Sequence, residues 1–142
     1  MIVVATEEEY NRFNTKGQDI IKTGVGYGNV FKALADIPRD TPIINIGYAG
    51  SNSIPIGTEC VISECRHYHP NVEYNEDTYR LNGQYVCYTS DDFVTHTDIT
   101  EPAVFDMELY AILSMGFTNV TAIKIVSDNL SLQEYENEVR MN

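Results

Sequence analysis

The chain has 142 residues, of which 43% are hydrophobic, and this length predicts one compact domain over residues 1–142. Nine basic and 21 acidic residues give a formal charge of -12, which argues against binding nucleic acids or anionic membranes, since both require a positive surface. The three cysteines lack paired spacing, the N-terminus does not resemble a signal peptide, and no apolar run is long enough to span a bilayer. We therefore expect a cytoplasmic protein with reduced thiols.

The first elements predicted are a strand, a helix and a second strand. Residues 1–6 form an apolar, β-branched run that predicts a buried strand, and Thr6 is the expected cap of a helix that begins with Glu7-Glu8-Glu9. Residues 19–23 predict the second strand, which leads through Gly24-Val25-Gly26-Tyr27-Gly28 into a helix at about residues 29–37. Such a glycine-rich turn lets backbone amides approach an anion or a sugar, but it lacks the last glycine of a dinucleotide-binding pattern.

The middle of the chain predicts further strands. They cover residues 43–47, 58–68 and 84–89; residues 48–51 form a small-residue turn, and residues 71–83 a polar loop or hairpin. Cys65, His67 and His69 alternate and would project from one face, as metal ligands can. Metal ligands usually converge from separate elements, so we expect ordinary polar residues and no metal, with Cys60, Cys65 and Cys87 filling the core.

The last third predicts a helix followed by a buried strand. The helix opens at Glu101-Pro102 and runs to Gly116, with Val104, Met107, Ala111 and Met115 on one apolar face. Residues 120–128 then form a strand that places Asp128 at its carboxyl end, where α/β proteins bind ligands. Taken alone, Asp128 is better explained as the cap of a helix that starts near Leu130. The alternation of strands and helices indicates an α/β layered fold.

Six short motifs, taken in order, resemble those of the nucleoside phosphorylase superfamily, and within it most closely the 5'-methylthioadenosine/S-adenosylhomocysteine nucleosidases, in a shortened form. The motifs are Ala5-Thr6-Glu7-Glu8-Glu9, Gly24-Val25-Gly26, Ile44-Asn45-Ile46-Gly47-Tyr48-Ala49-Gly50, Gly57 through Arg66-His67, Asp106-Met107-Glu108 and Val126-Ser127-Asp128. The resemblance implies a three-layer fold with a central mixed β-sheet flanked by helices. It also implies a purine nucleoside as the small-molecule partner and no cofactor. The exposed edges that a shortened fold leaves favour a homodimer or higher homo-oligomer.

The resemblance assigns roles to individual residues. Asp128 would be the acid that protonates purine N7, and Glu9 would activate water. The expected substrate-binding residues are Glu108 at the ribose hydroxyls, Met107 on the sugar, Phe93 and Val94 at the base, and Ser127 and Gly50 beside them. These roles agree with the chemistry, because glycosidic cleavage needs an acid at the purine and anionic groups around a ribosyl cation.

Hydrolysis is favoured over phosphorolysis. A phosphorylase of this superfamily would place an arginine near the glycine turn to hold phosphate. This chain has Asn45 before Ile46-Gly47 and no basic residue near Gly24-Val25-Gly26 beyond Lys22. Two alternatives remain open: a phosphorylase that uses Arg66 or Lys124 as its anion site, and a nucleoside-binding protein without turnover. Tyr48 occupies a position where members of this superfamily usually have a small residue. Its ring is therefore expected to enter the pocket or to change which 5'-group fits.

Overall fold

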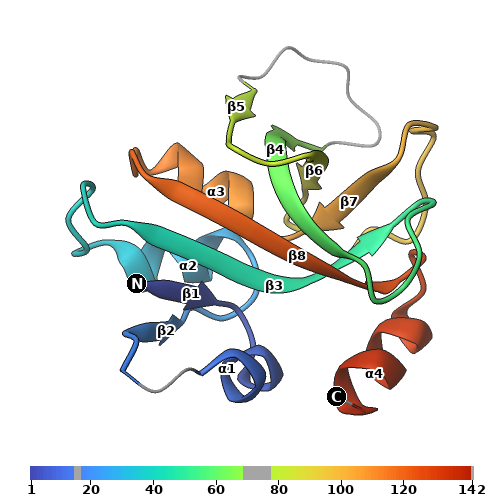
Figure 1. Ribbon diagram of the computed structural model, residues 1–142, viewed down its shortest axis with the longest axis horizontal. Coiled ribbons are helices and arrows are strands. Elements are labelled where there is room, and N and C mark those ends of the chain that lie inside the picture. The colour runs from blue at the N-terminus through green and yellow to red at the C-terminus, as the bar shows by residue number, and fades with distance from the viewer. Residues whose placement is uncertain (15–16, 69–77, 142) are drawn as a thin grey trace.

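The computed structural model describes residues 1–14, 17–68 and 78–141 (Figure 1). Its eight strands are β1 (Ile2–Val4), β2 (Ile20–Lys22), β3 (Ile43–Ser51), β4 (Glu59–His67), β5 (Tyr79–Arg80), β6 (Tyr85–Thr89), β7 (Ala103–Asp106) and β8 (Val120–Asp128). The helices are α1 (Glu7–Phe13), α2 (Tyr27–Leu34), α3 (Leu109–Ser114) and α4 (Leu132–Met141). This order confirms most of the strands expected from the sequence.

All eight strands belong to one mixed sheet, and part of that sheet closes on itself. The strand order is β2-β1-β3-β7-β6-β4-β5, and β8 pairs in parallel with β3 and antiparallel with β4. Strands β3, β7, β6, β4 and β8 therefore form a closed ring of five strands. The predicted α/β class with a mixed sheet and flanking helices is confirmed, but closure of the sheet into a barrel was not part of the three-layer expectation.

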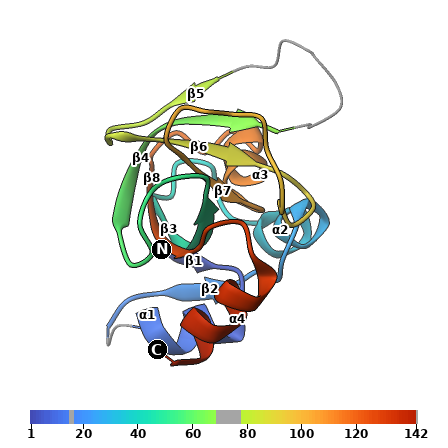
Figure 2. The ribbon, with the colours of Figure 1, turned by 90° about the vertical axis from the view of Figure 1, so that its right-hand side faces the viewer.

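Two groups of helices cover the sheet. Helices α2 and α3 pack together over β1 and β3 through a cluster of buried apolar side chains that includes Val3, Leu34 and Ile112. Helices α1 and α4 lie at the other end of the molecule (Figures 1 and 2), where Phe13 and Tyr135 pack against Tyr48 and Ile125 of the sheet. This second arrangement brings helices α1 and α4 close to the C-terminal halves of β3 and β8.

A further apolar cluster fills the region between β4, β6, β7 and β8. Cys60, Cys65 and Cys87 are all buried there as free thiols, which confirms their prediction as core residues. His69, the third member of the conceivable metal set, lies outside the described residues. Within the described ranges no group of three or more His, Cys, Asp or Glu side chains is placed to hold a metal ion. No helix among them is both long and apolar enough to cross a membrane.

The helix predicted from residue 102 to residue 116 is wrong in its first half. Residues Ala103–Asp106 form β7, which pairs in parallel with β6 and antiparallel with β3, and helix α3 begins only at Leu109. Val104 and Phe105 favour extended backbone, and two flanking strands supply hydrogen bonds that outweigh the helical spacing of apolar residues. Met107 and Glu108 consequently lie in the turn after β7, where both can face a cavity.

Two smaller differences concern β3 and α2. The predicted turn at residues 48–51 is instead the continuation of β3, with an irregularity in its pairing with β8 between Ala49 and Gly50. Helix α2 covers Tyr27–Leu34 and so begins directly after Gly26, two residues earlier than expected. In β3, Gly47 and Gly50 leave room for the carboxyl groups of Glu9 and Asp128. Gly24 and Gly26, with φ angles of 91° and 90°, form the turn before α2.

Candidate active site

A cavity of about 160 Å³ lies where β3, β7 and β8 end and where α1 and α4 approach them. Three carboxylic acids line it, each from a different part of the chain: Glu9 from α1, Glu108 from the turn after β7, and Asp128 from the end of β8. The rest of the wall is largely apolar and includes Val25, Tyr48, Gly50, Phe93, Phe105, Met107 and Tyr135. Acids separated by about 120 residues of sequence thus line one cavity.

Glu9 is fixed by the N-terminus of α1. Thr6 caps this helix as predicted: its side chain accepts a hydrogen bond from the Glu9 amide, and Glu9 Oε1 accepts bonds from the amides of Thr6 (3.2 Å) and Ala5 (2.7 Å). Glu9 Oε2 accepts a further bond from the Tyr48 amide at 2.9 Å. Burial raises the pKa of Glu9, against the lowering effect of the Lys124 charge and of these hydrogen bonds. Three hydrogen bonds therefore hold the carboxyl group in one orientation, and its raised pKa favours the protonated form more than in an exposed glutamate.

Glu108 joins the glycine-rich turn to the cavity. Its Oε2 accepts a hydrogen bond from the Gly26 amide at 3.1 Å, so the turn predicted to approach an anion contacts a carboxyl group of the protein. Burial raises the pKa of Glu108 to about 8; the Asp106 charge adds to this increase, Lys124 opposes it, and Glu9 adds to it. At neutral pH this carboxyl group is mostly protonated and can donate a hydrogen bond.

Asp128 is fully buried at the end of β8. Its Oδ1 accepts a hydrogen bond from the Ser127 hydroxyl at 2.8 Å, and its Oδ2 accepts bonds from the amides of Leu130 (2.9 Å) and Ser131 (3.2 Å). Burial raises the pKa of Asp128, while the three hydrogen bonds oppose that increase. Both sequence interpretations have support, since Asp128 binds the turn before α4 and also lines the cavity.

Aromatic side chains form part of the wall. The rings of Phe93 and Tyr135 meet edge to face, with centroids 5.8 Å apart, so an apolar edge of the cavity lies between the 90–94 segment and α4. Tyr135 was not among the predicted site residues, because it is the one aromatic residue in a polar helix and its sequence carries no signal of an approach to β8. Of the predicted base-binding pair, Phe93 lines the cavity and Val94 does not.

The remaining predicted residues fall into two groups. Gly50 and Met107 line the cavity directly, whereas Ser127 acts on it through its hydrogen bond to Asp128. Tyr48 also contributes to the wall, and its hydroxyl accepts a hydrogen bond from Arg12 Nη1 at 2.7 Å. The Tyr48 side chain is thus tied to α1 at its far end.

Neither predicted anion-binding cation reaches the cavity. Lys124 is buried with its Nζ 2.9 Å from Asp106 Oδ2, and Arg66 pairs at 2.9 Å with Glu64 on the surface. Within the described residues no lysine, arginine or histidine lines the cavity. The part of the wall that the structure describes therefore carries acids but no basic side chain that could hold a phosphate.

No protein-family model and no curated protein matches the chain. Solved structures do match its fold. The 5'-methylthioadenosine/S-adenosylhomocysteine nucleosidase from Neisseria meningitidis, in complex with methylthio-immucillin-A, superposes with a TM-score of 0.79 at 16% identity, over 98% of this chain and 90% of the other. The MTAN from Chlamydia trachomatis bound to adenine gives 0.78 at 16% identity, over 97% and 87%. An S-adenosylhomocysteine nucleosidase from Streptococcus pyogenes, in complex with 5-methylthiotubericidin, gives 0.76 at 17% identity, over 97% and 88%. The chain shares the fold of these nucleosidases.

Proposed function

We propose that the protein is a purine nucleosidase that hydrolyses the N-glycosidic bond of an adenosine-type nucleoside, such as methylthioadenosine or S-adenosylhomocysteine. The observation that carries this proposal is the single cavity that brings together Glu9, Glu108 and Asp128, three buried acids from separate elements. The likeness in fold to nucleosidases with bound methylthioadenosine analogues or adenine supports it. The products would be the free base and a ribose derivative.

Asp128 is assigned the role of acid. As the glycosidic bond breaks, its electron pair moves to the purine, which is a better leaving group when N7 takes a proton. A buried carboxyl with a raised pKa retains a proton closer to neutral pH than an exposed one. The hydrogen bonds from Ser127, Leu130 and Ser131 fix the orientation of this carboxyl and stabilise the carboxylate that remains after transfer.

Glu9 is assigned the role of the base that activates water. In the reaction, a water oxygen attacks the anomeric carbon, and the proton that it loses passes to Glu9. The amides of Ala5, Thr6 and Tyr48 hold this carboxylate in place. A carboxylate at this position also stabilises positive charge on the ribosyl ring electrostatically.

Glu108, Met107 and Phe93 are assigned to binding. Glu108 can exchange hydrogen bonds with ribose hydroxyls, Met107 offers an apolar surface to the sugar, and Phe93 with Tyr135 offers rings to the base. The acidic wall suits a neutral nucleoside whose sugar becomes cationic in the transition state. It does not suit a second anionic substrate, so water is the preferred nucleophile.

The test is release of base from methylthioadenosine, S-adenosylhomocysteine, adenosine and inosine, each with and without phosphate. We expect phosphate-independent adenine release that Asp128→Asn lowers by about 10² to 10⁴-fold. Asp98→Asn is the matched control, because that residue is exposed and does not line the cavity. Release that requires phosphate would show a phosphorylase, and tight binding of adenosine analogues without release would show a binding protein.

A further inference from the structure

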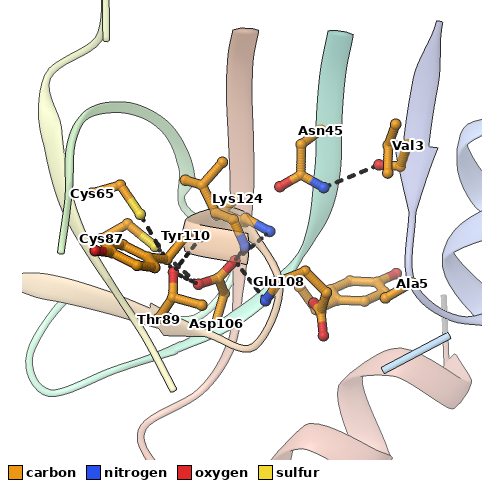
Figure 3. Close-up of polar contacts among 12 residues, drawn as sticks. Val3, Ala5, Asn45, Cys65, Cys87, Thr89, Asp106, Glu108, Tyr110 and Lys124 are labelled. Carbon is orange, nitrogen blue, oxygen red and sulfur yellow. Dashed lines mark hydrogen bonds and ion pairs between the residues drawn. The ribbon is translucent and has the colours of Figure 1, made fainter. Parts of the chain in front are cut away.

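Lys124 is buried beside the cavity without lining it. It is the one lysine or arginine among the described residues that is buried, with 1% of its surface exposed. Four residues before Asp128 on β8, it pairs in register with Gly47 of β3. Its ammonium group lies 2.9 Å from Asp106 Oδ2 at the end of β7 (Figure 3). A buried cation at this place needs an explanation, because removing its charge from water is costly.

Asp106 connects this ammonium group to Glu108. Its Oδ2, which faces Lys124, also accepts hydrogen bonds from the amides of Leu109 (2.8 Å) and Glu108 (3.4 Å). Its Oδ1 accepts bonds from Thr89 Oγ1 (2.6 Å) and Cys87 Sγ (3.3 Å). Asp106 is thus held as a carboxylate at the start of α3, one residue from the turn that carries Met107 and Glu108.

The position of Gly47 shows where Lys124 lies relative to Glu9. A β-carbon on Gly47 would lie 2.8 Å from Glu9 Oε2, so the Glu9 carboxyl group occupies the space that a side chain at Gly47 would fill. In parallel strands, residues paired in register project to the same face, and Lys124 is the register partner of Gly47. The ammonium group and the Glu9 carboxyl group therefore lie on the same face of β3 and β8.

We propose that Lys124 is a positioning residue for the cavity: fixed by Asp106, it supplies the positive charge that allows the acids Glu9 and Glu108 to lie together. Four ionisable groups, Glu9, Asp106, Glu108 and Lys124, share this buried region. With every group ionised the set would carry a net charge of about -2, which a buried site tolerates poorly, so one of the two glutamates keeps a proton. Lys124 and Asp106 together decide how tightly that proton is held.

The groups that act on this set come from α1, β6, β7, the turn after β7 and α4. Cys87 of β6, Asp106 of β7, Glu108 and Glu9 all act on Lys124, and Glu108 is affected by Asp106, Lys124 and Glu9. Tyr135 of α4 also faces Glu9, Glu108 and Asp128. Lys124 lowers the pKa of Glu108 and of Glu9, whereas Asp106 raises that of Glu108. Removal of Lys124 should therefore raise the pKa of Glu108, and removal of Asp106 should lower it.

The experiment follows the Glu108 carboxyl resonance by carbon NMR in protein labelled with ¹³C at the glutamate side chains, with Glu108→Gln as the assignment control. Lys124→Met should raise the titration midpoint of Glu108 by about one pH unit or more, and Asp106→Asn should lower it. The double variant, which loses both charges, should return close to the wild-type midpoint. Thermal unfolding of each variant verifies that it is folded.

An unchanged Glu108 midpoint in folded Lys124→Met would overturn the proposal. If Lys124→Met does not fold because Asp106 is left without its partner, an unchanged midpoint in Asp106→Asn overturns it equally. The consequence for turnover rests on the proposed function. If the protein is a nucleosidase, the pH optimum of base release should shift in the same direction as the Glu108 titration midpoint. The titration itself requires no substrate, so failure to find base release leaves this test intact.

Discussion

A β-carbon on Gly50 would lie 2.8 Å from Oδ2 of Asp128, closer than ordinary contact allows, so the acid at the end of β8 fits only beside a glycine in β3. The same β-carbon would lie 3.1 Å from Leu130 Cδ2, so a second side chain would also have to shift. The irregular pairing of β3 with β8 occurs at this point. The site and the sheet geometry are therefore coupled.

Gly50→Ala should displace the Asp128 carboxyl group and lower base release by at least about tenfold, with a loss of roughly 1–3 kcal/mol in the free energy of unfolding. Enzyme assays and urea denaturation measure the two effects. Gly28→Ala is the matched control, since a β-carbon at that helical position contacts nothing within 4 Å. That control should keep its activity and gain roughly 0.5–1 kcal/mol. Full activity in Gly50→Ala would contradict the coupling.

Thr6→Ala should affect stability and the proposed base together. The Thr6 side chain caps α1 while the capping carboxyl group is Glu9, so the loss of this bond should cost about 1 kcal/mol and loosen Glu9. We expect slower base release with little change in substrate affinity, measured as kcat and KM. Thr6→Ser retains the hydroxyl and should behave like the wild type. A loss of stability with unchanged kcat would show that the proposed catalytic role of Glu9 does not depend on the Thr6 cap.

Stability should fall as pH rises through the range between the ordinary and the raised pKa of Glu108. Unfolded Glu108 ionises near its ordinary value of 4.5, whereas in the folded protein burial raises its pKa to about 8. Between these values the folded state binds more protons, so the free energy of unfolding decreases with pH, by a few kcal/mol in total. Above about 8 this decrease is complete.

Thermal unfolding from pH 5 to pH 9 measures that dependence. Glu108→Gln should flatten the curve in part, because the pKa values of Glu9 and Asp128 are also raised and retain a slope of the same sign. Glu101→Gln, at an exposed position, is the control and should leave the curve unchanged. A wild-type melting temperature that rises steadily over this range would contradict the protonated state of Glu108.

The three thiols should be unreactive in the folded protein. Cys60, Cys65 and Cys87 are completely buried, and burial raises the pKa of Cys60 to about 11, which leaves little thiolate at neutral pH. Ellman's reagent should label none of them in native buffer and all three in guanidinium chloride. Rapid labelling of the native protein would show that β4 or β6 opens locally.

Local patterns predicted the parts of the fold that depend on local chemistry. The Thr6 cap, the strand that ends at Asp128 and the glycine-rich turn beside Glu108 all follow from neighbouring residues, and the structure contains each. The resemblance also selected a set of residues that mostly gather at one cavity. Their catalytic roles remain predictions.

Features that depend on distant partners could not be predicted in this way. Ala103–Asp106 carries a helical spacing of apolar residues, yet pairing with β6 and β3 makes it a strand. The contact of Lys124 with Asp106, and that of Tyr135 with Phe93, join segments whose sequences carry no mutual signal. Closure of the five-strand ring is likewise a property of pairing partners, since β8 must meet both β3 and β4.

Because β8 completes that ring, ligand binding in the cavity also reports on folding. Strand β8 brings Asp128 and Lys124 into the molecule only after residues more than 70 positions earlier, in β3, are in place to pair with it. A slip of one residue in that pairing would turn both side chains to the opposite face. Contacts of such sequence separation form late and slowly, so ligand binding should recover after compaction and after the local helices during refolding. Recovery of binding then measures the moment at which the barrel closes.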